Sequence, residues 1–550
     1  MNRTVLVAQV ALVTTVMAAC SDTTADPRRD DTAADGAIDA ATDAAIDAPV
    51  DTSDDPGSDT GTTDTSTDGP SDAEDVQTDV ADTARDVADD TVDATIDADA
   101  ETDAADVAID VDAPTDAADA DADLHPDDRP HLVLVVLDDV GVEVVEPWAS
   151  AFDAGAVVAA TPTLDAIAAR GLTFETAWAT PTCSPTRAGL HTGLYPSRAG
   201  ILGPAGSEPI LAPDDPTLPR LLGAAGYRTG LLGKWHLGGS DAAPVTDGGW
   251  HTYVGQPAGV LPAYDDWIRT SVDTDGTVTS APTTTYATTA VVDDALAWAA
   301  TQPTDAPWLV MLAFNAPHTP HHLPPADLRP GIPDSAIDAD GDGTCDDDGA
   351  CMRAMLTAVD TELGRFVAAF DALANDRDTV LVVLGDNGTN RTAIQAPWTR
   401  AHAKGTVYEG GLRVPLWVDG PDTLVTRGTA PGLAHASVDV YATLLELGGA
   451  PVPDGIDGVS LVPVLADPDA TVRSNLFCDG RHTIRMVETE AAAARDARYK
   501  VLVPDVDAPD VWECFDLADD PNERDDLRAA GTAPPACEDL RATIDTIRSR

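Results

Sequence analysis

The chain has 550 residues, and its 95 acidic residues outnumber its 32 basic residues to give a formal net charge of −63 at pH 7. So acidic a balance argues against a nucleic-acid partner, because every phosphate contact needs a local cation. It does not exclude a small anionic substrate in a locally basic pocket. Residues 21–128 carry 36 acids against three Arg and contain no Phe, Trp or Tyr, so they cannot bury enough apolar area to fold. The remaining 422 residues exceed what one core usually supports, which predicts two domains.

Residues 1–19 have the pattern of a bacterial export signal. Arg3 gives a positive start, residues 4–16 form an apolar run too short to span a bilayer, and two alanines lead into Cys20. A Cys at this place resembles a lipobox, in which the Cys carries the lipid. The pattern predicts a lipoprotein of the bacterial cell envelope, anchored in the outer membrane through the lipid on Cys20, on either its periplasmic or its surface face. The alternative is an ordinary secretory signal with an incidental Cys20.

Residues 20–128 repeat Asp every two to four positions among Ala, Thr and Val. Like charges repel and extend such a chain, so we expect a disordered tether between the lipidated Cys20 and the folded region. Weak, multivalent calcium binding is the alternative for this segment.

Order is expected from residue 129 onward. Three continuous runs rich in Val and Leu, at residues 131–137, 308–314 and 379–384, predict strands that are buried on both faces. Intervening patterns predict helices, and these are residues 162–170, 218–225, 286–301 and 351–373. Buried strands that alternate with helices predict an α/β fold, with a large mixed sheet covered by helices on both faces.

Polar residues follow each of the three predicted strands. Asp138 and Asp139 follow the first, Asn315 and His318 follow the second, and Asp386-Asn387 follow the third. In α/β sheets, ligands gather beyond the carboxyl ends of the strands, so these side chains are candidates for one site. Taken singly, each acidic pair is equally well explained as a helix N-cap.

The run Cys183-Ser184-Pro185-Thr186-Arg187 is the most informative in the chain. A Cys at the start of a predicted helix is either a reactive thiol, favoured by the helix dipole, or a buried inert one. The run matches the Cys-x-Pro-x-Arg signature of the sulfatases, and Thr192-Gly193 continues it. The chain therefore resembles the type I, formylglycine-dependent sulfatases of the alkaline phosphatase superfamily, in which this Cys is oxidised to an aldehyde whose hydrate is the nucleophile.

Further segments resemble this family in its own order, and the resemblance covers nearly all of residues 130–527. They predict a catalytic domain over residues 129–473. The matching segments are Leu137-Asp138-Asp139-Val140-Gly141, Gly233-Lys234-Trp235-His236-Leu237-Gly238, Ala316-Pro317-His318-Thr319-Pro320, Gly385-Asp386-Asn387-Gly388 and Lys404-Gly405 with the trailing Tyr408 to Pro415.

The resemblance implies a metal site. Asp138, Asp139, Asp386 and Asn387 supply only oxygen ligands, which select a hard cation, Ca²⁺ or Mg²⁺. The family favours Ca²⁺ over Mg²⁺, with an oxygen of the modified residue 183 as a further ligand.

The resemblance also implies catalytic roles for seven residues. Arg187, Lys234 and Lys404 would neutralise the sulfate group, and Asp386 would be the base for the attacking hydroxyl at residue 183. His318 and Lys404 would protonate the leaving oxygen, and His236 would deprotonate the second hydroxyl so that sulfate is expelled. The implied partners are a sulfated small molecule or glycan and a formylglycine-generating maturation enzyme. Tyr408 and Arg413 are expected to shape their loop and not to contact substrate.

Residues 338–351 form an acidic insert that begins like a calcium loop, with Asp338, Asp340, Asp342 and Gly343 at the first, third, fifth and sixth positions. The twelfth position is Gly349, so the usual bidentate carboxylate is missing. A structural Ca²⁺ loop and a plain solvated insert are both compatible with this pattern. Cys345 and Cys351 could form a disulfide across it in an oxidising compartment.

Residues 474–550 predict a small antiparallel sheet with a closing helix. Short strands are expected at residues 483–487, 499–503 and 511–515. Cys478, Cys514 and Cys537 leave one disulfide possible, and the sequence does not say which two residues form it.

Three functions compete. The first is a lipid-anchored, calcium-dependent sulfatase acting on sulfated carbohydrates or aryl sulfates. The second is a phosphonate monoester or phosphodiester hydrolase, because related enzymes of the superfamily use the same modified Cys. The third is a non-catalytic surface protein that binds glycans.

Overall fold

A computed structural model describes residues 128–550 except 154, 375–376 and 485–486. The predicted export signal at residues 1–19, Cys20 and the predicted tether up to residue 127 lie outside the described residues. None of the helices in the described part combines the length and the apolar character that a membrane span requires.

A mixed sheet of ten strands forms the larger part of the fold, in the order β10-β2-β9-β8-β1-β7-β3-β4-β5-β6. The five strands from β8 to β4 run parallel, whereas β9, β5 and β6 are antiparallel to their neighbours. The bounds are β1 His131–Leu137, β2 Leu172–Trp178, β3 Arg228–Lys234, β4 Thr252–Gln256, β5 Trp267–Val272, β6 Val278–Thr283, β7 Trp308–Ala313, β8 Thr379–Gly385, β9 Leu416–Asp419 and β10 Gly428–His435.

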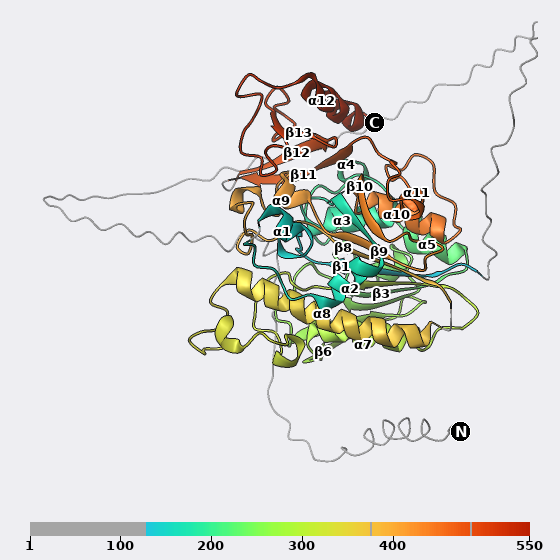
Figure 1. Cartoon of the computed structure of the whole chain (residues 1–550). Helices are drawn as coiled ribbons and strands as arrows, with labels where there is room; N and C mark the ends of the chain where they lie inside the picture. The colour runs from blue at the N-terminus through green and yellow to red at the C-terminus, as the bar shows by residue number, and fades with distance from the viewer. Residues whose placement is uncertain (1–127, 154, 375–376, 485–486) are drawn as a thin grey trace, which may run out of the picture. The chain divides into compact units, whose positions relative to one another are not determined.

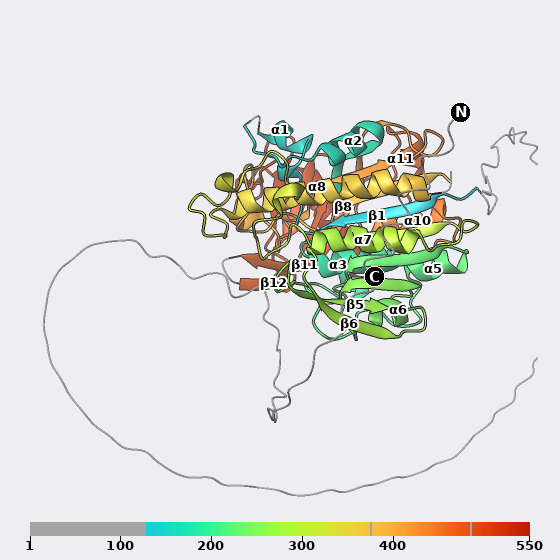
Figure 2. The ribbon, with the colours of Figure 1, turned by 90° about the horizontal axis from the view of Figure 1, so that it is seen from below.

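Helices cover both faces of this sheet, as the sequence predicted (Figures 1 and 2). All seven residues of β1 are buried, because alternate side chains enter two separate cores. Leu132 packs in the core beneath α3, α5 and α10, whereas Val133 packs beneath α2, α7 and α8. These helices are α2 Pro162–Arg170, α3 Cys183–Thr192, α5 Leu218–Ala224, α7 Ala287–Ala299, α8 Asp348–Leu373 and α10 Val438–Leu447.

The predicted strands and helices of this region lie within a few residues of the observed ones. The largest difference is at α8, which begins at Asp348, three residues before the predicted start. The Asp347 carboxylate caps this helix by accepting a hydrogen bond from the backbone N–H of Ala350. Shorter helices are α1 Trp148–Phe152, α4 Pro196–Ala199, α6 Ala243–Thr246, α9 Glu409–Leu412 and α11 Val462–Ala466.

A second, antiparallel sheet follows in the C-terminal part, in the order β11-β12-β13-β14 (Figure 1). Its strands are β11 Leu476–Ile484, β12 Val487–Arg495, β13 Tyr499–Val503 and β14 Glu513–Asp516, and α12 Pro535–Arg548 packs on it. The predicted strand at residues 483–487 was wrong, since this range runs from the end of β11 into the start of β12. The prediction missed most of β12 because Ala491 to Ala494 are poor strand formers in isolation, although all four are buried here.

Two disulfides are present among the described residues, one in the C-terminal part and one across the insert. Cys514 in β14 bonds to Cys537 in α12, and Cys345 bonds to Cys351 at the start of α8. Cys478 is a buried free thiol. The possible bridge across the insert is therefore formed, and the ambiguity among the three C-terminal cysteines is resolved.

Candidate active site

Four neighbouring strands, β8, β1, β7 and β3, deliver polar side chains to one edge of the large sheet. Asp138 and Asp139 follow β1, and Asp386 and Asn387 follow β8. His318 comes after β7, while Lys234 is the last residue of β3. Because these strands are parallel, their carboxyl ends meet at this edge, and all the side chains are buried there.

Cys183 enters the same place from a helix. It is the first residue of α3, a ten-residue helix in which every residue is buried. The Thr186 hydroxyl donates a hydrogen bond of 2.6 Å to the Asp386 carbonyl, and this contact ties the first turn of α3 to the loop after β8. Ligand atoms of Asp138, Asp139, Cys183 and His318 all lie within 4.8 Å of one another.

Two cations connect Cys183 with the carboxylates. The Lys234 ammonium lies 2.5 Å from an Asp138 carboxylate oxygen and 3.6 Å from the Cys183 sulfur. The Arg187 guanidinium lies 2.8 Å from Asp386 and 3.7 Å from Asp138, and it also donates to the Lys234 carbonyl. Both cations are fully buried, so the ion pairs are not screened by solvent.

Asp139 is held by a second set of partners, Lys404 and Asn387. The Lys404 ammonium lies 2.8 Å from its carboxylate, and the Asn387 amide donates to the same oxygen at 2.7 Å. His318 Nε2 lies 3.9 Å from the other carboxylate oxygen of Asp139. The backbone of Asp139 is left-handed, with φ of 66°, which is uncommon for a residue other than Gly and is found at strained functional positions.

His236 is the second site residue with a left-handed backbone, at φ of 57°. Its carbonyl accepts a hydrogen bond from the Ser184 hydroxyl, next to Cys183, and its N–H donates to Pro257. Gly259 lies directly against the imidazole ring, so that a Cβ at Gly259 would lie 2.3 Å from Nε2. The ring is thus fixed between the Cys183 turn and the loop after β4.

The protonation states follow from burial and charge. Burial and the charge of Asp138 raise the pKa of Asp386 to about 6. Burial also raises the pKa of Asp139, but Lys404 and His318 outweigh it and hold that pKa below its usual range. Burial, together with the Lys404 charge, lowers the pKa of His318 to about 4, and burial with Lys234 lowers that of His236 well below its usual value. Both histidines are therefore neutral at pH 7 in the protein alone.

The described site balances three carboxylates against three cations. Asp138, Asp139 and Asp386 carry the negative charges, and Arg187, Lys234 and Lys404 carry the positive ones. The structure thus brings together all ten of the residues that the sequence predicted for catalysis or metal binding in the folded region, in one buried cluster.

Tyr264 and Thr389 support the site by hydrogen bonds to the loops that carry its residues, and the sequence analysis identified neither. The Tyr264 hydroxyl lies 2.7 Å from the carbonyl oxygens of Asn315 and His318, so it fixes the turn that carries His318. The Thr389 hydroxyl accepts from Gly141, and the Thr389 carbonyl accepts from the backbone of Lys404. Thr389 directly extends the Asp386 motif and could have been included, whereas nothing local marks Tyr264.

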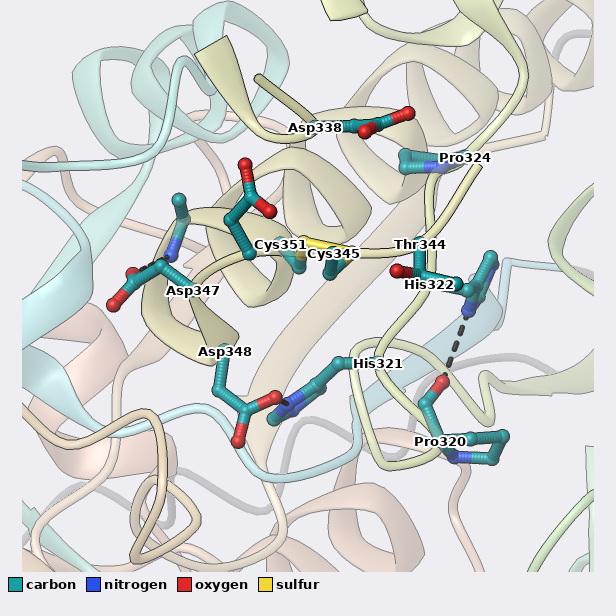
Figure 3. The surroundings of a disulfide bond; sticks show 12 residues. Pro320, His321, His322, Pro324, Asp338, Thr344, Cys345, Asp347, Asp348 and Cys351 are labelled. Carbon is teal, nitrogen blue, oxygen red and sulfur yellow. Dashed lines mark hydrogen bonds and ion pairs between the residues drawn. A yellow bond between two sulfur atoms is a disulfide. The ribbon is translucent and has the colours of Figure 1, made fainter. Parts of the chain in front are cut away.

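The acidic insert lies near the His318 segment but has a different character (Figure 3). His321 Nδ1 pairs with the Asp348 carboxylate at 3.0 Å, beside the Cys345–Cys351 disulfide. Carboxylate oxygens of Asp338, Asp340 and Asp342 lie within 4.8 Å of one another, but the last two residues are exposed. The Asp338 carboxylate accepts hydrogen bonds from the backbone of residues 341, 342 and 343.

Two family models match the chain. The model described as Sulfatase matches residues 130–450, and the one described as N-sulphoglucosamine sulphohydrolase, C-terminal, matches residues 399–550. The first match covers more than half of the chain, and the chain belongs to the sulfatase family.

Named relatives agree with this membership. Mouse arylsulfatase J is 27% identical over 381 residues, which are 66% of this chain and 59% of the relative. The matched region therefore spans less than two thirds of that protein. The curated relatives bear the names of sulfuric ester hydrolases.

Solved structures share the fold. A structure of Ps i-CgsB in complex with k-i-k-neocarrahexaose has a TM-score of 0.60 at 24% identity, covering 76% of this chain and 92% of that one. A structure of BT4656 in complex with its substrate D-Glucosamine-2-N, 6-O-disulfate has a TM-score of 0.58 at 19% identity, covering 76% of this chain and 98% of that one. The predicted fold, with a large mixed sheet and a small antiparallel one, is confirmed by this likeness.

Proposed function

We propose that the protein hydrolyses sulfate esters through a formylglycine made from Cys183, with a calcium ion bound beside it. The observation that carries the proposal is the buried convergence of Asp138, Asp139, Asp386 and Asn387 with three cations around residue 183. Family membership supports the reaction class. The net reaction consumes one water and releases an alcohol and hydrogen sulfate from the ester.

The residues at the sheet edge fit a hard cation. Asp138 Oδ1 and Asn387 Oδ1 are buried oxygen atoms without a hydrogen-bond partner in the described structure. A buried polar oxygen left unpaired is costly, and a metal ion would satisfy both. Oxygen donors from carboxylates and an amide favour Ca²⁺, with Mg²⁺ as the weaker candidate. We therefore assign Asp138, Asp139, Asp386 and Asn387 as the ligands, together with residue 183.

The unmodified thiol is a poor nucleophile at this position. Burial raises the pKa of Cys183 to about 12, and Lys234 and Lys404 only partly offset this effect. A thiol with that pKa is protonated at neutral pH, whereas thiol chemistry requires the thiolate. When formed and bound, the aldehyde hydrate would supply the attacking hydroxyl and the calcium ion would polarise the sulfate oxygens.

The chain's own residues would then bind the anion and move protons. Arg187 and Lys234 hold the sulfate beside residue 183, and Lys404 neutralises it from the Asp139 side. Asp386 accepts the proton of the attacking hydroxyl.

The other proton transfers involve Lys404 and the two histidines. The Lys404 ammonium, assisted by the neutral His318, delivers a proton to the leaving oxygen. His236 removes the proton from the second hydroxyl at residue 183, so that sulfate leaves.

A sulfated carbohydrate or an aryl sulfate is the proposed substrate class. Support comes from the arylsulfatases among the relatives and from a structural neighbour solved in complex with its substrate, a sulfated glucosamine. A screen of sulfated oligosaccharides and small aryl sulfates, followed by release of inorganic sulfate, identifies the substrate within this class.

Two measurements test the activity and the modification. Kinetics on 4-nitrophenyl sulfate and on bis(4-nitrophenyl) phosphate should give the higher kcat/KM for the sulfate, and a preference for the phosphodiester would favour the phosphohydrolase alternative. Peptide mass spectrometry should find residue 183 about 18 Da lighter than Cys, as expected for sulfur-to-oxygen exchange with loss of two hydrogens. An unmodified residue 183 in the native host would favour the non-catalytic glycan-binding alternative.

We also propose that the enzyme is held on the cell envelope by a lipid at Cys20, through the tether at residues 20–128. The lipobox-like end of the first 19 residues and the repeated Asp residues support this proposal. Labelling with a radioactive fatty acid should mark the wild type but not Cys20→Ser, and the variant should leave the membrane fraction with unchanged kcat. Equal labelling of both proteins would contradict the lipid anchor.

A further inference from the structure

Four of the six residues from Lys404 to Glu409, namely Gly405, Val407, Tyr408 and Glu409, contact the C-terminal part of the chain. Lys404 carries the ammonium that pairs with Asp139, and its backbone N–H donates to the Thr389 carbonyl at 3.0 Å. The following residues run along the end of the small sheet and then begin α9 at Glu409. The residues that directly follow Lys404 are thus held by the C-terminal part, whereas the Lys404 backbone is held by Thr389 and Arg391.

The first contacts involve strand β11. The Gly405 carbonyl accepts a hydrogen bond from the Thr483 backbone at 2.8 Å, and the Val407 N–H donates to His482 Nδ1 at 3.1 Å. The Gly405 N–H donates to the carbonyl of Pro181, two residues before Cys183, and Gly405 has a φ of 81°. Gly405 therefore joins the Cys183 turn, Lys404 and the small sheet in a backbone conformation that favours Gly.

The next contacts lie deeper in the C-terminal part. The Tyr408 hydroxyl donates to a Glu513 carboxylate oxygen at 2.8 Å, and the Glu409 N–H donates to a Glu523 carboxylate oxygen at 2.6 Å. Tyr408 thus shapes this loop, as the sequence predicted, and its hydroxyl is occupied by Glu513.

A buried group of charges surrounds the Glu409 carboxylate. It lies 2.9 Å from Arg495, 3.2 Å from Lys500 and 3.0 Å from the Trp178 indole nitrogen, and Lys500 lies 2.7 Å from Glu523. Burial raises the pKa of Glu409, but Arg495 and Lys500 outweigh it and hold that pKa at about 2. Removal of one member would leave the others buried without a partner, which is expensive, so the group fixes one geometry.

We propose that Glu409 is a positioning residue for Lys404, and that the C-terminal sheet acts through Glu409, Gly405 and His482 to place the Lys404 ammonium at the leaving oxygen. This inference rests on the proposed function, in which Lys404 and His318 act on that oxygen. The C-terminal sheet is then part of the catalytic apparatus although none of its residues is assigned to the reacting atoms.

The test uses the leaving group as a reporter of Lys404. An alkyl or sugar sulfate leaves as a strongly basic alkoxide and needs the cation and the proton, whereas 4-nitrophenyl sulfate leaves as a stabilised phenolate and needs them far less. Glu409→Gln in the full chain should therefore lower kcat for the alkyl sulfate about tenfold more than for the aryl sulfate, with little change in KM. Equal losses of both rates in the folded variant would overturn the proposal.

A double-mutant cycle tests whether Glu409 acts through Lys404. Lys404→Met alone should show the same unequal loss, and Glu409→Gln added to it should change kcat on the alkyl sulfate by less than about twofold. If the two losses multiply as for independent residues, the positioning role is wrong.

Two further variants serve as controls, one for stability and one for a failure of Glu409→Gln to fold. Asp439→Asn is the matched control. In the described structure the Asp439 carboxylate forms a buried ion pair of the same kind with Arg473 and accepts from the backbone of His435 and Val459. This variant should lower thermal stability without changing the ratio of alkyl to aryl rates, and an equal change in that ratio would overturn the proposal. If Glu409→Gln does not fold, His482→Ala is measured in its place and interpreted by the same two criteria.

The outcomes separate this inference from the proposed function. A wild-type enzyme with confirmed formylglycine and metal but no turnover of any sulfate refutes the function and the inference together. An active wild type in which both variants keep the normal ratio of rates refutes only the positioning by the C-terminal sheet.

Discussion

Two clusters of carboxylates in this protein look alike in sequence and differ in structure. Asp138 and Asp139 at the sheet edge are fully buried, whereas Asp340 and Asp342 in the insert are exposed. Both clusters bring carboxylate oxygens within 4.8 Å of one another. The two clusters therefore share the proximity of their acidic side chains and differ in how far those side chains are buried.

The partners of the carboxylates make the difference. The buried cluster is neutralised by cations from distant parts of the chain, since Lys234 and Lys404 are 96 and 265 residues away from their partners Asp138 and Asp139. In the insert, Asp338 accepts from backbone groups no more than five residues away. The sheet edge is thus built by the whole fold and can exclude water from a reaction, while the insert loop is a local structure open to solvent.

The largest expected effect is at residue 183. Cys183→Ala should abolish turnover of aryl sulfates, a loss of at least about 10⁴-fold, because it removes the proposed nucleophile. Cys183→Ser should also be inactive unless the host matures serine. Full activity of Cys183→Ala in a continuous assay would contradict the proposed mechanism.

Replacement of one acid in each cluster tests the comparison directly. Asp139→Asn should lower kcat/KM by about 10²- to 10³-fold, because Lys404 loses its ion pair with Asp139 and the site loses one of the proposed charged metal ligands. Asp340→Asn in the exposed insert is the matched control and should stay within about twofold of wild type. Similar losses in the two variants would mean that the insert takes part in catalysis.

Metal removal should distinguish the clusters by affinity. Dialysis against a chelator should abolish activity, and Ca²⁺ at about 1,000 times its dissociation constant should restore activity and add about 4 kcal/mol of stability. Asp138→Ala should lose this calcium-dependent stabilisation, whereas the Asp340→Asn/Asp342→Asn double variant should keep it. Calorimetric unfolding with and without Ca²⁺ measures the effect, and an unchanged response of Asp138→Ala would remove the assigned metal site.

Glu143 gives the smallest expected effect and represents a third environment. Its carboxyl is buried, and none of the ion pairs among the described residues includes it. Burial raises its pKa to about 7, with the Thr389 side chain opposing the shift. Its ordinary pKa is about 4.3, so the folded state holds the proton more tightly and this contribution to stability is lost as pH rises from about 4.3 through 7. Glu143→Gln should reduce the fall in the free energy of unfolding between pH 5 and 8, as measured by urea denaturation at each pH. A fall as steep as that of the wild type would show that Glu143 does not titrate there.

Much of the fold and of the site was predictable because the relevant signals are local. The apolar run at residues 131–137 predicted a doubly buried strand and became β1 without a change of bounds. The Asp138, Asp386 and Cys183 motifs each lie directly at the end of a strand or the start of a helix, so the prediction of strands and helices also placed these three motifs in the fold.

The missed features depend on contacts between distant residues. Tyr264 meets His318 across 54 residues, and Glu409 meets Lys500 and Glu523 across 91 and 114. No spacing in the sequence marks such partners. Strand β12 is similar, because its alanines form a strand only when β11 and β13 pair with it on both sides.

The parallel pairing of β1 with β8 has a consequence for the timing of biosynthesis. The loops after these strands belong to one site, yet Asp386 is synthesised 203 residues after Cys183. At about 5–20 residues per second, that interval lasts about 10–40 s. During that interval the residues after β8 are not yet present beside residue 183. In the complete fold, Cys183 is 2% exposed. If Cys183 is oxidised as proposed, the maturation enzyme must therefore work on the unfinished or unfolded chain. The rate of translation and the delay before folding would then set how much of the protein becomes active.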